Sequence, residues 1–383
     1  MKTASDNRNF WLLVVVGGLV TALGLGAAHF MEIHGHIVTG MNNQVVWGLP
    51  HVFAIFMIVA ASGVLNVASI GSVFGQPAYK PRAPLSGLLC LAMLAGGLMV
   101  LMLDLGRPER IVVAATHYNF KSVFAWNVFL YTGMFAIVAF YLWMQLEKRM
   151  YRYAKPAGIA ALVWRFVLTT GTGSIFAFLV ARQAYASAVL PPLFIAMSLA
   201  WGMAVFVLVQ AAVGGIGDDL LRRMKNLLGV LVALVLYFTV VYHMTNLYFA
   251  RQTEFERFIL LDGGVYPWLF WVGYVLVGSV IPMLLVWRAA ATARSLQAAA
   301  ALTLVGAFAA LYVFIIGGQA FPLEIFPGHE VTSSFADGQV ARYTPSAYEV
   351  ALGMGGMGVA FLITVVGVRV LPFLPQDDLK TTS

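Results

Sequence analysis

The sequence predicts an all-α membrane protein that crosses the bilayer about ten times. Of the 383 residues, 61% are hydrophobic and only 10% are charged, whereas soluble domains carry about 25% charged residues. The mean hydropathy is +0.86. The apolar residues also fall into blocks of about 20, the length that a helix needs to cross a bilayer. A protein of this composition cannot cover a large water-facing surface, so a set of soluble domains is excluded.

Ten apolar windows define the predicted spans, which form one integral membrane domain over residues 1–383. They cover residues 10–30, 49–74, 84–104, 123–144, 157–187, 192–213, 224–249, 265–287, 297–317 and 346–371. The first window has a basic flank, but it is too long for a signal-peptide core, so we expect it to be retained.

The basic residues predict the orientation of these spans. An even number of spans places both termini on one side. Of the 23 Lys and Arg residues, 15 fall in or beside the loops and tails on that side, seven fall on the other, and Arg165 lies inside a span. Because basic loops stay in the cytoplasm, we expect cytoplasmic termini in a bacterial or archaeal inner membrane. The longest outer loop is then residues 318–345.

Several other functions are excluded at this stage. A single cysteine, Cys90, rules out a disulfide framework or an iron–sulfur cluster held by this chain alone. The net charge of +7 comes from basic residues between the apolar blocks, so it is a topology signal and predicts no nucleic-acid partner. We predict no metal site. The sequence GMGGMG at 353–358 matches a dinucleotide pattern, but it lies inside an apolar span and indicates close helix packing.

Titratable side chains cluster near the predicted outer surface. Ionisable groups in hydrocarbon are costly and usually functional. Those near the outer ends of five spans are His29, Glu32, His51, Asp104, Tyr242, His243, Tyr348 and Glu349. The alternative is that each is an interfacial residue that reaches for headgroups and water. Only their clustering favours a site.

The second span carries a polar stripe. His51, Ser62, Asn66 and Ser69 project onto nearly one face of a helix. The stripe, with Arg165 of the fifth span, could carry protons toward the outer cluster. Close packing of helices through hydrogen bonds explains Ser and Asn equally well, and Arg165 could simply extend toward the membrane surface.

The third span ends in the sequence LDLGRPER, residues 103–110. Gly106 suits the left-handed position after a helix, and Pro108 prevents its continuation. A carboxylate is disfavoured at a helix C-terminus, so Asp104 needs a cation. Arg107 is the nearest candidate in the sequence.

LDLGRPER and the run FAWNVFLYTG at 124–133 resemble the NrfD/PsrC family, the membrane subunits of polysulfide reductase and related respiratory complexes. Residues 35–70 resemble the DsrP branch, which is linked to dissimilatory sulfite reductase. The resemblance implies two four-helix bundles, from spans two to five and six to nine, with flanking helices at each end. It also implies a quinone-reactive subunit in sulfur metabolism, with a periplasmic ferredoxin-like iron–sulfur partner and other membrane and cytochrome subunits.

This resemblance and the outer cluster together predict a quinone site, for menaquinone or ubiquinone, near the outer side of the first four helices. Asp104, Glu32 and His51 are the expected proton-transfer groups. His29 and Tyr131 are placed by the family's use of the first and fourth spans, and Arg107 and His243 are expected to support the site. The predicted proton path is Ser62, Asn66, Ser69 and Arg165.

Two alternatives remain open from the sequence. A b-haem needs two histidines on facing helices, which His51 with His243 or His29 could supply. However, no histidine falls in an inner half of a span, where b-haem proteins usually carry a second pair. A secondary transporter would place its site at mid-membrane on broken helices, and only the polar run at 169–174 suggests this.

Overall fold

The computed structural model describes residues 4–214, 216–323 and 338–374. The described residues form helices and connections and contain no strand. Ten of the helical stretches are long and apolar enough to cross a membrane, which confirms the predicted number of spans. Residues 324–337 of the predicted outer loop lie outside the described part.

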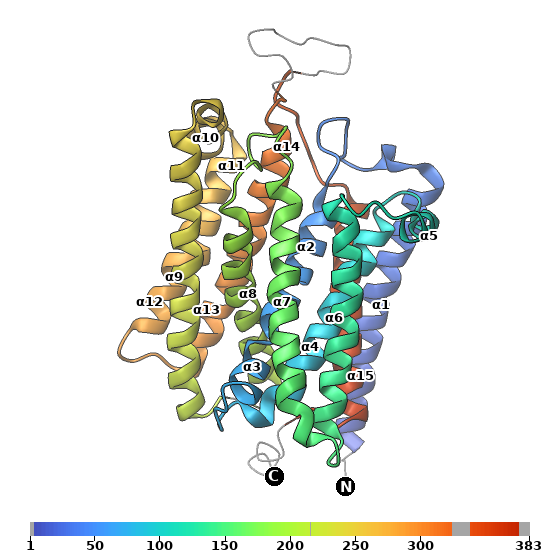
Figure 1. The fold of residues 1–383 in the computed structure, drawn as a ribbon, viewed down its shortest axis with the longest axis vertical. Coiled ribbons are helices and arrows are strands. Elements are labelled where there is room, and N and C mark those ends of the chain that lie inside the picture. Colours follow the sequence, from blue (N-terminus) through green and yellow to red (C-terminus); the bar gives the residue numbers. More distant parts are fainter. Residues whose placement is uncertain (1–3, 215, 324–337, 375–383) are drawn as a thin grey trace.

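Figure 1 shows the long helices running side by side along one axis. Their bounds are α1 (Ala4–His34), α2 (Leu49–Val64) continued by α3 (Asn66–Ser72), α4 (Ala83–Leu103), α6 (Val123–Leu146), α7 (Ala154–Ala177), α8 (Leu190–Val213), α9 (Asp218–Tyr248), a π-helical segment (Leu269–Val280) continued by α12 (Ile281–Trp287), α13 (Ala293–Tyr312) and α15 (Ala347–Val370). Short helices follow some of them, namely α5 (Ile111–Thr116), α10 (Thr253–Arg257), α11 (Val265–Trp268) and α14 (Gly318–Ala320).

One predicted span boundary was wrong, and two other segments have local structure that hydropathy did not predict. The fifth span ends at Ala177, because residues 178–189 leave the helix and Arg182 binds the carbonyl oxygens of Gln44 and Gln319. The second span is interrupted at Leu65, whose ψ of −1° departs from the helix. The predicted outer loop 250–264 is largely helical. Apolar composition locates a span, but tertiary hydrogen bonds decide where its helix ends.

The helices form two four-helix groups with a flanking pair. The first bundle contains α2 with α3, α4, α6 and α7, and the second contains α8, α9, α13 and the helix formed by Leu269–Val280 and α12. The flanking helices α1 and α15 pack on each other, and α15 also packs on α4. Helix α1 begins and α15 ends at the same end of the molecule (Figure 1). The opposite end is called the outer end below, following the predicted orientation.

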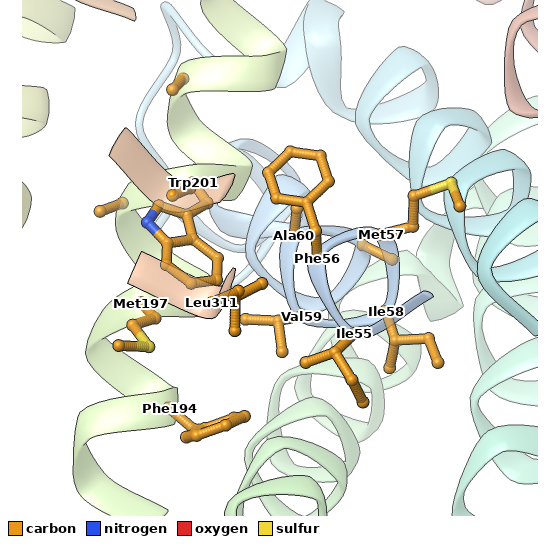
Figure 2. Packing of buried hydrophobic residues seen from close by; sticks show 14 of the residues in the cluster. Ile55, Phe56, Met57, Ile58, Val59, Ala60, Phe194, Met197, Trp201 and Leu311 are labelled. Carbon is orange, nitrogen blue, oxygen red and sulfur yellow. The ribbon is translucent and has the colours of Figure 1, made fainter. Parts of the chain in front are cut away.

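The two bundles meet where α2 crosses α8. A Cβ atom on Gly63 would lie 1.5 Å from the carbonyl oxygen of Ser198, so the two backbones are in direct contact. Figure 2 shows the apolar side chains around this crossing, with Phe56 and Met57 on α2 and Trp201 on α8. Small residues at such a crossing allow close approach, which drives helix association in lipid.

The GMGGMG sequence serves the same purpose, as the sequence analysis predicted. Gly355 faces Gly24 of α1, where an added Cβ would lie 2.7 Å from the Cα atom of Gly24. Gly356 faces the carbonyl oxygen of Gly96 on α4 at 2.8 Å by the same measure. The glycines of α15 therefore allow it to lie between α1 and α4.

Candidate functional site

The first bundle carries a histidine–carboxylate pair at its outer end. His51 opens the helix α2 and Asp104 caps the C-terminus of α4. The two helices pack on each other, and His51 Nδ1 lies 2.7 Å from Asp104 Oδ2. The side chain of Asp104 is 1% exposed and that of His51 is 13% exposed. The contact lacks the geometry of an aligned hydrogen bond, and it is an ion pair when the imidazole carries a second proton.

This pair corrects the prediction that Arg107 holds Asp104. Arg107 is exposed, and among the described residues no ion pair joins it to Asp104. The sequence argument chose the nearest cation along the chain. In the structure the partner of Asp104 is His51 from a neighbouring helix, and the backbone turns away from α4 at Gly106, where φ is +70°.

A small pocket lies between α1 and the turn that ends α4, and the pair itself does not line it. It is lined by Leu25, Ala28, His29, Met31, Glu32, His36, Leu103, Gly106 and Pro108, and its volume is about 110 Å³. His29 and Glu32 come from one face of α1, as predicted. His36 was not predicted as a site residue. A Cβ atom on Gly106 would lie 2.9 Å from His36 Nε2, so the glycine allows this ring to approach the turn.

Tyr131 does not line this pocket. It is buried in α6, where its hydroxyl pairs with the side chain of Thr172 on α7. Asn127, one turn earlier, donates to the carbonyl oxygen of Gly171 at 3.2 Å. These contacts join α6 to α7, while the pocket belongs to α1 and α4. The structure therefore brings His29 and Glu32 together in a pocket at the end of α4, while His51 and Asp104 pair between α2 and α4 and Tyr131 lies between α6 and α7.

The predicted polar stripe meets Arg165 near the middle of the first bundle. Arg165 Nη1 donates to Asn66 Oδ1 at 2.8 Å and to the carbonyl oxygen of Ser62 at 3.2 Å. The hydroxyl of Ser62 lies 2.7 Å from that of Thr169. Arg165 is 4% exposed, and the described residues offer it no ion pair with a carboxylate. Ser69 is buried further along the stripe on α3.

The second bundle contains another histidine–carboxylate pair that the sequence analysis missed. His243 Nδ1 on α9 lies 2.6 Å from Glu256 Oε2 on α10. The amide of Asn246 donates to Glu256 Oε1 at 2.7 Å, and Glu256 is fully buried. Glu256 was assigned to an outer loop, so its burial was not foreseen. His243 and His51 thus belong to different bundles, and each has its own carboxylate.

Glu349, another member of the outer cluster, lies in a structural latch. Its carboxylate accepts hydrogen bonds from the Tyr343 hydroxyl at 2.6 Å, from the Gly40 amide at 2.8 Å and from the Ser346 amide at 2.7 Å. The Tyr343 oxygen accepts from the amide of Leu49 at 2.6 Å. Burial and the Glu349 carboxylate raise the pKa of Tyr343 well above its ordinary value, so the hydroxyl stays a donor. The latch fixes the start of α2, and hence His51.

Comparison with known proteins identifies relatives of the whole chain. The Hdr-like menaquinol oxidoreductase integral membrane subunit of Archaeoglobus fulgidus is 29% identical, over 98% of this chain and 96% of the relative. A subunit of the selenate reductase of Mesobacillus selenatarsenatis is 21% identical, over 97% and 96%. A subunit of the polysulfide reductase of Wolinella succinogenes is 24% identical, over 63% of this chain and 83% of the relative. The similarity to the DsrP branch stays a prediction.

The family model described as polysulphide reductase, NrfD, matches residues 37–323. This range includes His51, Asp104, Arg165, His243 and Glu256, and it covers well over half of the chain. The chain is therefore a member of the polysulphide reductase NrfD family of membrane proteins.

Proposed function

We propose that this chain is the quinone-reactive membrane subunit of a multi-subunit respiratory oxidoreductase. It exchanges electrons between the membrane quinone pool and an iron–sulfur subunit docked on the outer face. The observation that carries this proposal is the gathering of titratable groups at the end of α4, where His29, Glu32 and His36 line the outer pocket and His51 pairs with the buried Asp104. The name of one relative supports menaquinone as the quinone, and that of another supports a place in sulfur metabolism.

The pocket suits one end of a quinone ring. Its volume of about 110 Å³ is below the roughly 300 Å³ of ordinary ligand sites. A quinone would therefore enter by an edge, with one carbonyl oxygen near the histidines and its tail in the bilayer. Leu25, Ala28 and Leu103 supply an apolar wall, and His29 and His36 supply hydrogen-bond donors.

The His51–Asp104 pair supports proton exchange at this end. Reduction of a quinone consumes two electrons and two protons, and oxidation of a quinol releases them. An imidazole beside a buried carboxylate can hold one proton without leaving a net charge in the membrane. His51 is also partly exposed, so its ring can exchange that proton with water. Asp104 orients the ring and balances its charge.

The test uses the assembled complex and a soluble quinol analogue. We expect Asp104→Asn to preserve assembly and to lower quinol turnover by roughly 10²-fold or more, the scale of a lost positioned proton-transfer group. Asp219→Asn is the matched control, because Asp219 is an exposed carboxylate paired with Arg223 on α9. Near-wild-type turnover in Asp104→Asn would show that the pair only closes the helix end.

A photoreactive quinone analogue locates the site independently of turnover. We expect labelled peptides from the outer part of α1 and from residues 103–108, which line the pocket. Excess unlabelled quinone should abolish this labelling. Specific labelling confined to α9 or α13 would place the quinone in the second bundle and contradict the proposal.

A further inference from the structure

The proposed quinone site leaves the His243–Glu256 pair of the second bundle without a role. Glu256 is fully buried at the outer end, and no Lys or Arg among the described residues forms an ion pair with it. Its partners are His243 and Asn246, both on α9. A buried carboxylate is costly unless its charge is balanced or it carries a proton. A protonated His243 beside an ionised Glu256 has no net charge, so one added proton balances the buried carboxylate.

A small cavity lies directly beside this pair. It is lined by Leu193, Met197, Thr239, Tyr242, His243, Phe255, Ile259, Phe270, Tyr274, Ala310, Val313 and Phe314, and its volume is about 40 Å³. This is too small for a quinone ring but has room for one to about three water molecules. The wall of the cavity is mainly apolar, and Thr239, Tyr242, His243 and Tyr274 are the lining residues that could bind a water molecule there.

The backbone around this cavity is unusual. The described residues include three π-helical segments, at Phe258–Asp262, Leu269–Val280 and Val313–Gly317. All three contribute to the cavity wall, through Ile259, through Phe270 and Tyr274, and through Val313 and Phe314. π-Helical turns are rare and often occur at functional sites, because they widen the helix and displace side chains. Ordinary packing of α10 on α9 does not require three of them.

Hydroxyl groups continue from the cavity toward the middle of the membrane. Thr239 is four residues before His243, so it lies about 6 Å further inward on the same face of α9. Its hydroxyl is 2.8 Å from that of Tyr274. Each hydroxyl can both donate and accept a hydrogen bond. Water in the cavity would connect this hydroxyl pair to the imidazole of His243.

We propose that His243 and Glu256 form a second proton-exchange site, which takes up and releases one proton through water in the adjacent cavity. In the loaded state the pair is an imidazolium beside a carboxylate. On release, the imidazolium gives its proton to water and leaves a neutral imidazole beside the carboxylate. Tyr274 and Thr239 pass the proton inward. The coupling of this site to quinone turnover rests on the proposed function, but the exchange itself does not.

Few other charged groups face the pair. On α9 the neighbours of Glu256 are His243, Asn246 and Tyr242, and the Tyr242 hydroxyl donates to the carbonyl oxygen of Ala184. At the end of α10, Arg257 pairs with Asp262 at the exposed surface. The helix at Leu269–Val280 contributes Tyr274 to the cavity, and α13 with the π-helical segment Val313–Gly317 contributes apolar side chains. A proton change at this site is therefore a change of the His243–Glu256 pair.

The first test needs no quinone. Infrared difference spectra are recorded on the purified complex after a pH jump. We expect carboxyl and imidazole bands that disappear in both Glu256→Gln and His243→Gln. Glu349→Gln is the matched control, because Glu349 is equally buried but is held by three donors in the latch, and it should keep the bands. Wild-type spectra without any band that both substitutions remove would overturn the proposal and leave the pair as a static link between α9 and α10.

The second test asks whether water in the cavity carries the proton. Thr239→Val and Tyr274→Phe remove the hydroxyl pair while Glu256 and His243 remain. We expect these variants to retain the infrared bands but to slow their appearance after the pH jump by roughly tenfold or more, the scale of one lost proton-transfer group. Thr364→Val on α15, where the hydroxyl only binds its own helix, should have no effect. Unchanged rates in both cavity variants would refute a route through this cavity.

Coupling is measured last, in liposomes that contain the complex. Glu256→Gln should lower the number of protons moved per quinol, while quinol oxidation continues when the proton gradient is dissipated. A complex without quinol turnover in wild type would contradict the proposed quinone function, yet the infrared result would still decide the proton site. An unchanged proton yield in Glu256→Gln would overturn the coupling.

Discussion

Gly106→Ala tests whether the turn after α4 shapes the outer pocket that we propose binds a quinone. Gly106 has φ of +70°, a conformation that costs an L-residue roughly 1–2 kcal/mol. A Cβ atom there would also lie 2.9 Å from His36 Nε2, closer than such contacts normally allow, so the His36 ring must move. The backbone strain lowers the stability. The movement of His36 changes the pocket and should lower quinol turnover roughly tenfold or more, because a small displacement of a group at a reacting centre lowers the reaction rate strongly.

Gly75→Ala separates these two effects. Gly75 has φ of +72°, and nothing lies within 4 Å of its added Cβ atom. It follows α3 at the opposite end of the molecule from the pocket. Thermal unfolding in detergent should show a similar loss of roughly 1–2 kcal/mol in both variants. Turnover should fall only in Gly106→Ala. Turnover that stays at the wild-type level in both variants, or that falls by the same factor in both, would refute the role of His36 at the pocket.

Two further predictions concern the framework that holds the site. Tyr343→Phe removes one of the three donors to the Glu349 carboxylate and the acceptor of the Leu49 amide, so we expect the free energy of unfolding to fall by about 1–3 kcal/mol. An unchanged melting temperature would show that the latch does not stabilise the fold. Gly63→Ala places a Cβ atom 1.5 Å from the carbonyl oxygen of Ser198 and should lower the free energy of unfolding by about 3 kcal/mol or more. Gly18→Ala, where nothing lies within 4 Å of the added Cβ atom, should leave the free energy of unfolding nearly unchanged in the same assay.

Hydropathy predicted the spans well because each helix that crosses the bilayer needs enough apolar residues along its own length and forms its backbone hydrogen bonds internally. A run of about 20 apolar residues has the same meaning wherever its neighbours lie. A break in a helix, in contrast, depends on the residues that pack against it. The interruption at Leu65 lies inside a predicted span, and the neighbouring Ser62, Asn66 and Ser69 do not by themselves distinguish a break from a polar face of an unbroken helix. It depends on Ser86 of α4, whose hydroxyl donates to the Val64 carbonyl and accepts from the Ala68 amide.

The candidate site could be predicted in part for a similar reason. Single ionisable residues in apolar spans are visible in a sequence, and His51, Asp104 and His243 were found in this way. The pairing of these residues was not found, because contacts between helices depend on the tertiary structure. Asp104 was assigned to Arg107, three residues away, although its partner is 53 positions earlier in the sequence, at His51. Glu256 was overlooked because a glutamate in an apparent loop is usually exposed.

The two bundles differ in the buried charged groups that a proton would meet inside them. In the first bundle, the interruption after Val64 and the side chain of Asn66 supply the acceptors that hold Arg165. These are the residues predicted to form a proton path, and here they surround a fixed positive charge. A buried guanidinium repels a proton in a medium of low dielectric constant, as arginines do in selective pores. In the second bundle, the described residues that are buried include Glu256 but no Lys or Arg. A proton at the outer end of that bundle therefore meets a carboxylate and hydroxyl groups, which favours the second bundle for a proton route toward the middle of the membrane, while His51 and Asp104 of the first bundle serve the proposed quinone site at its outer end.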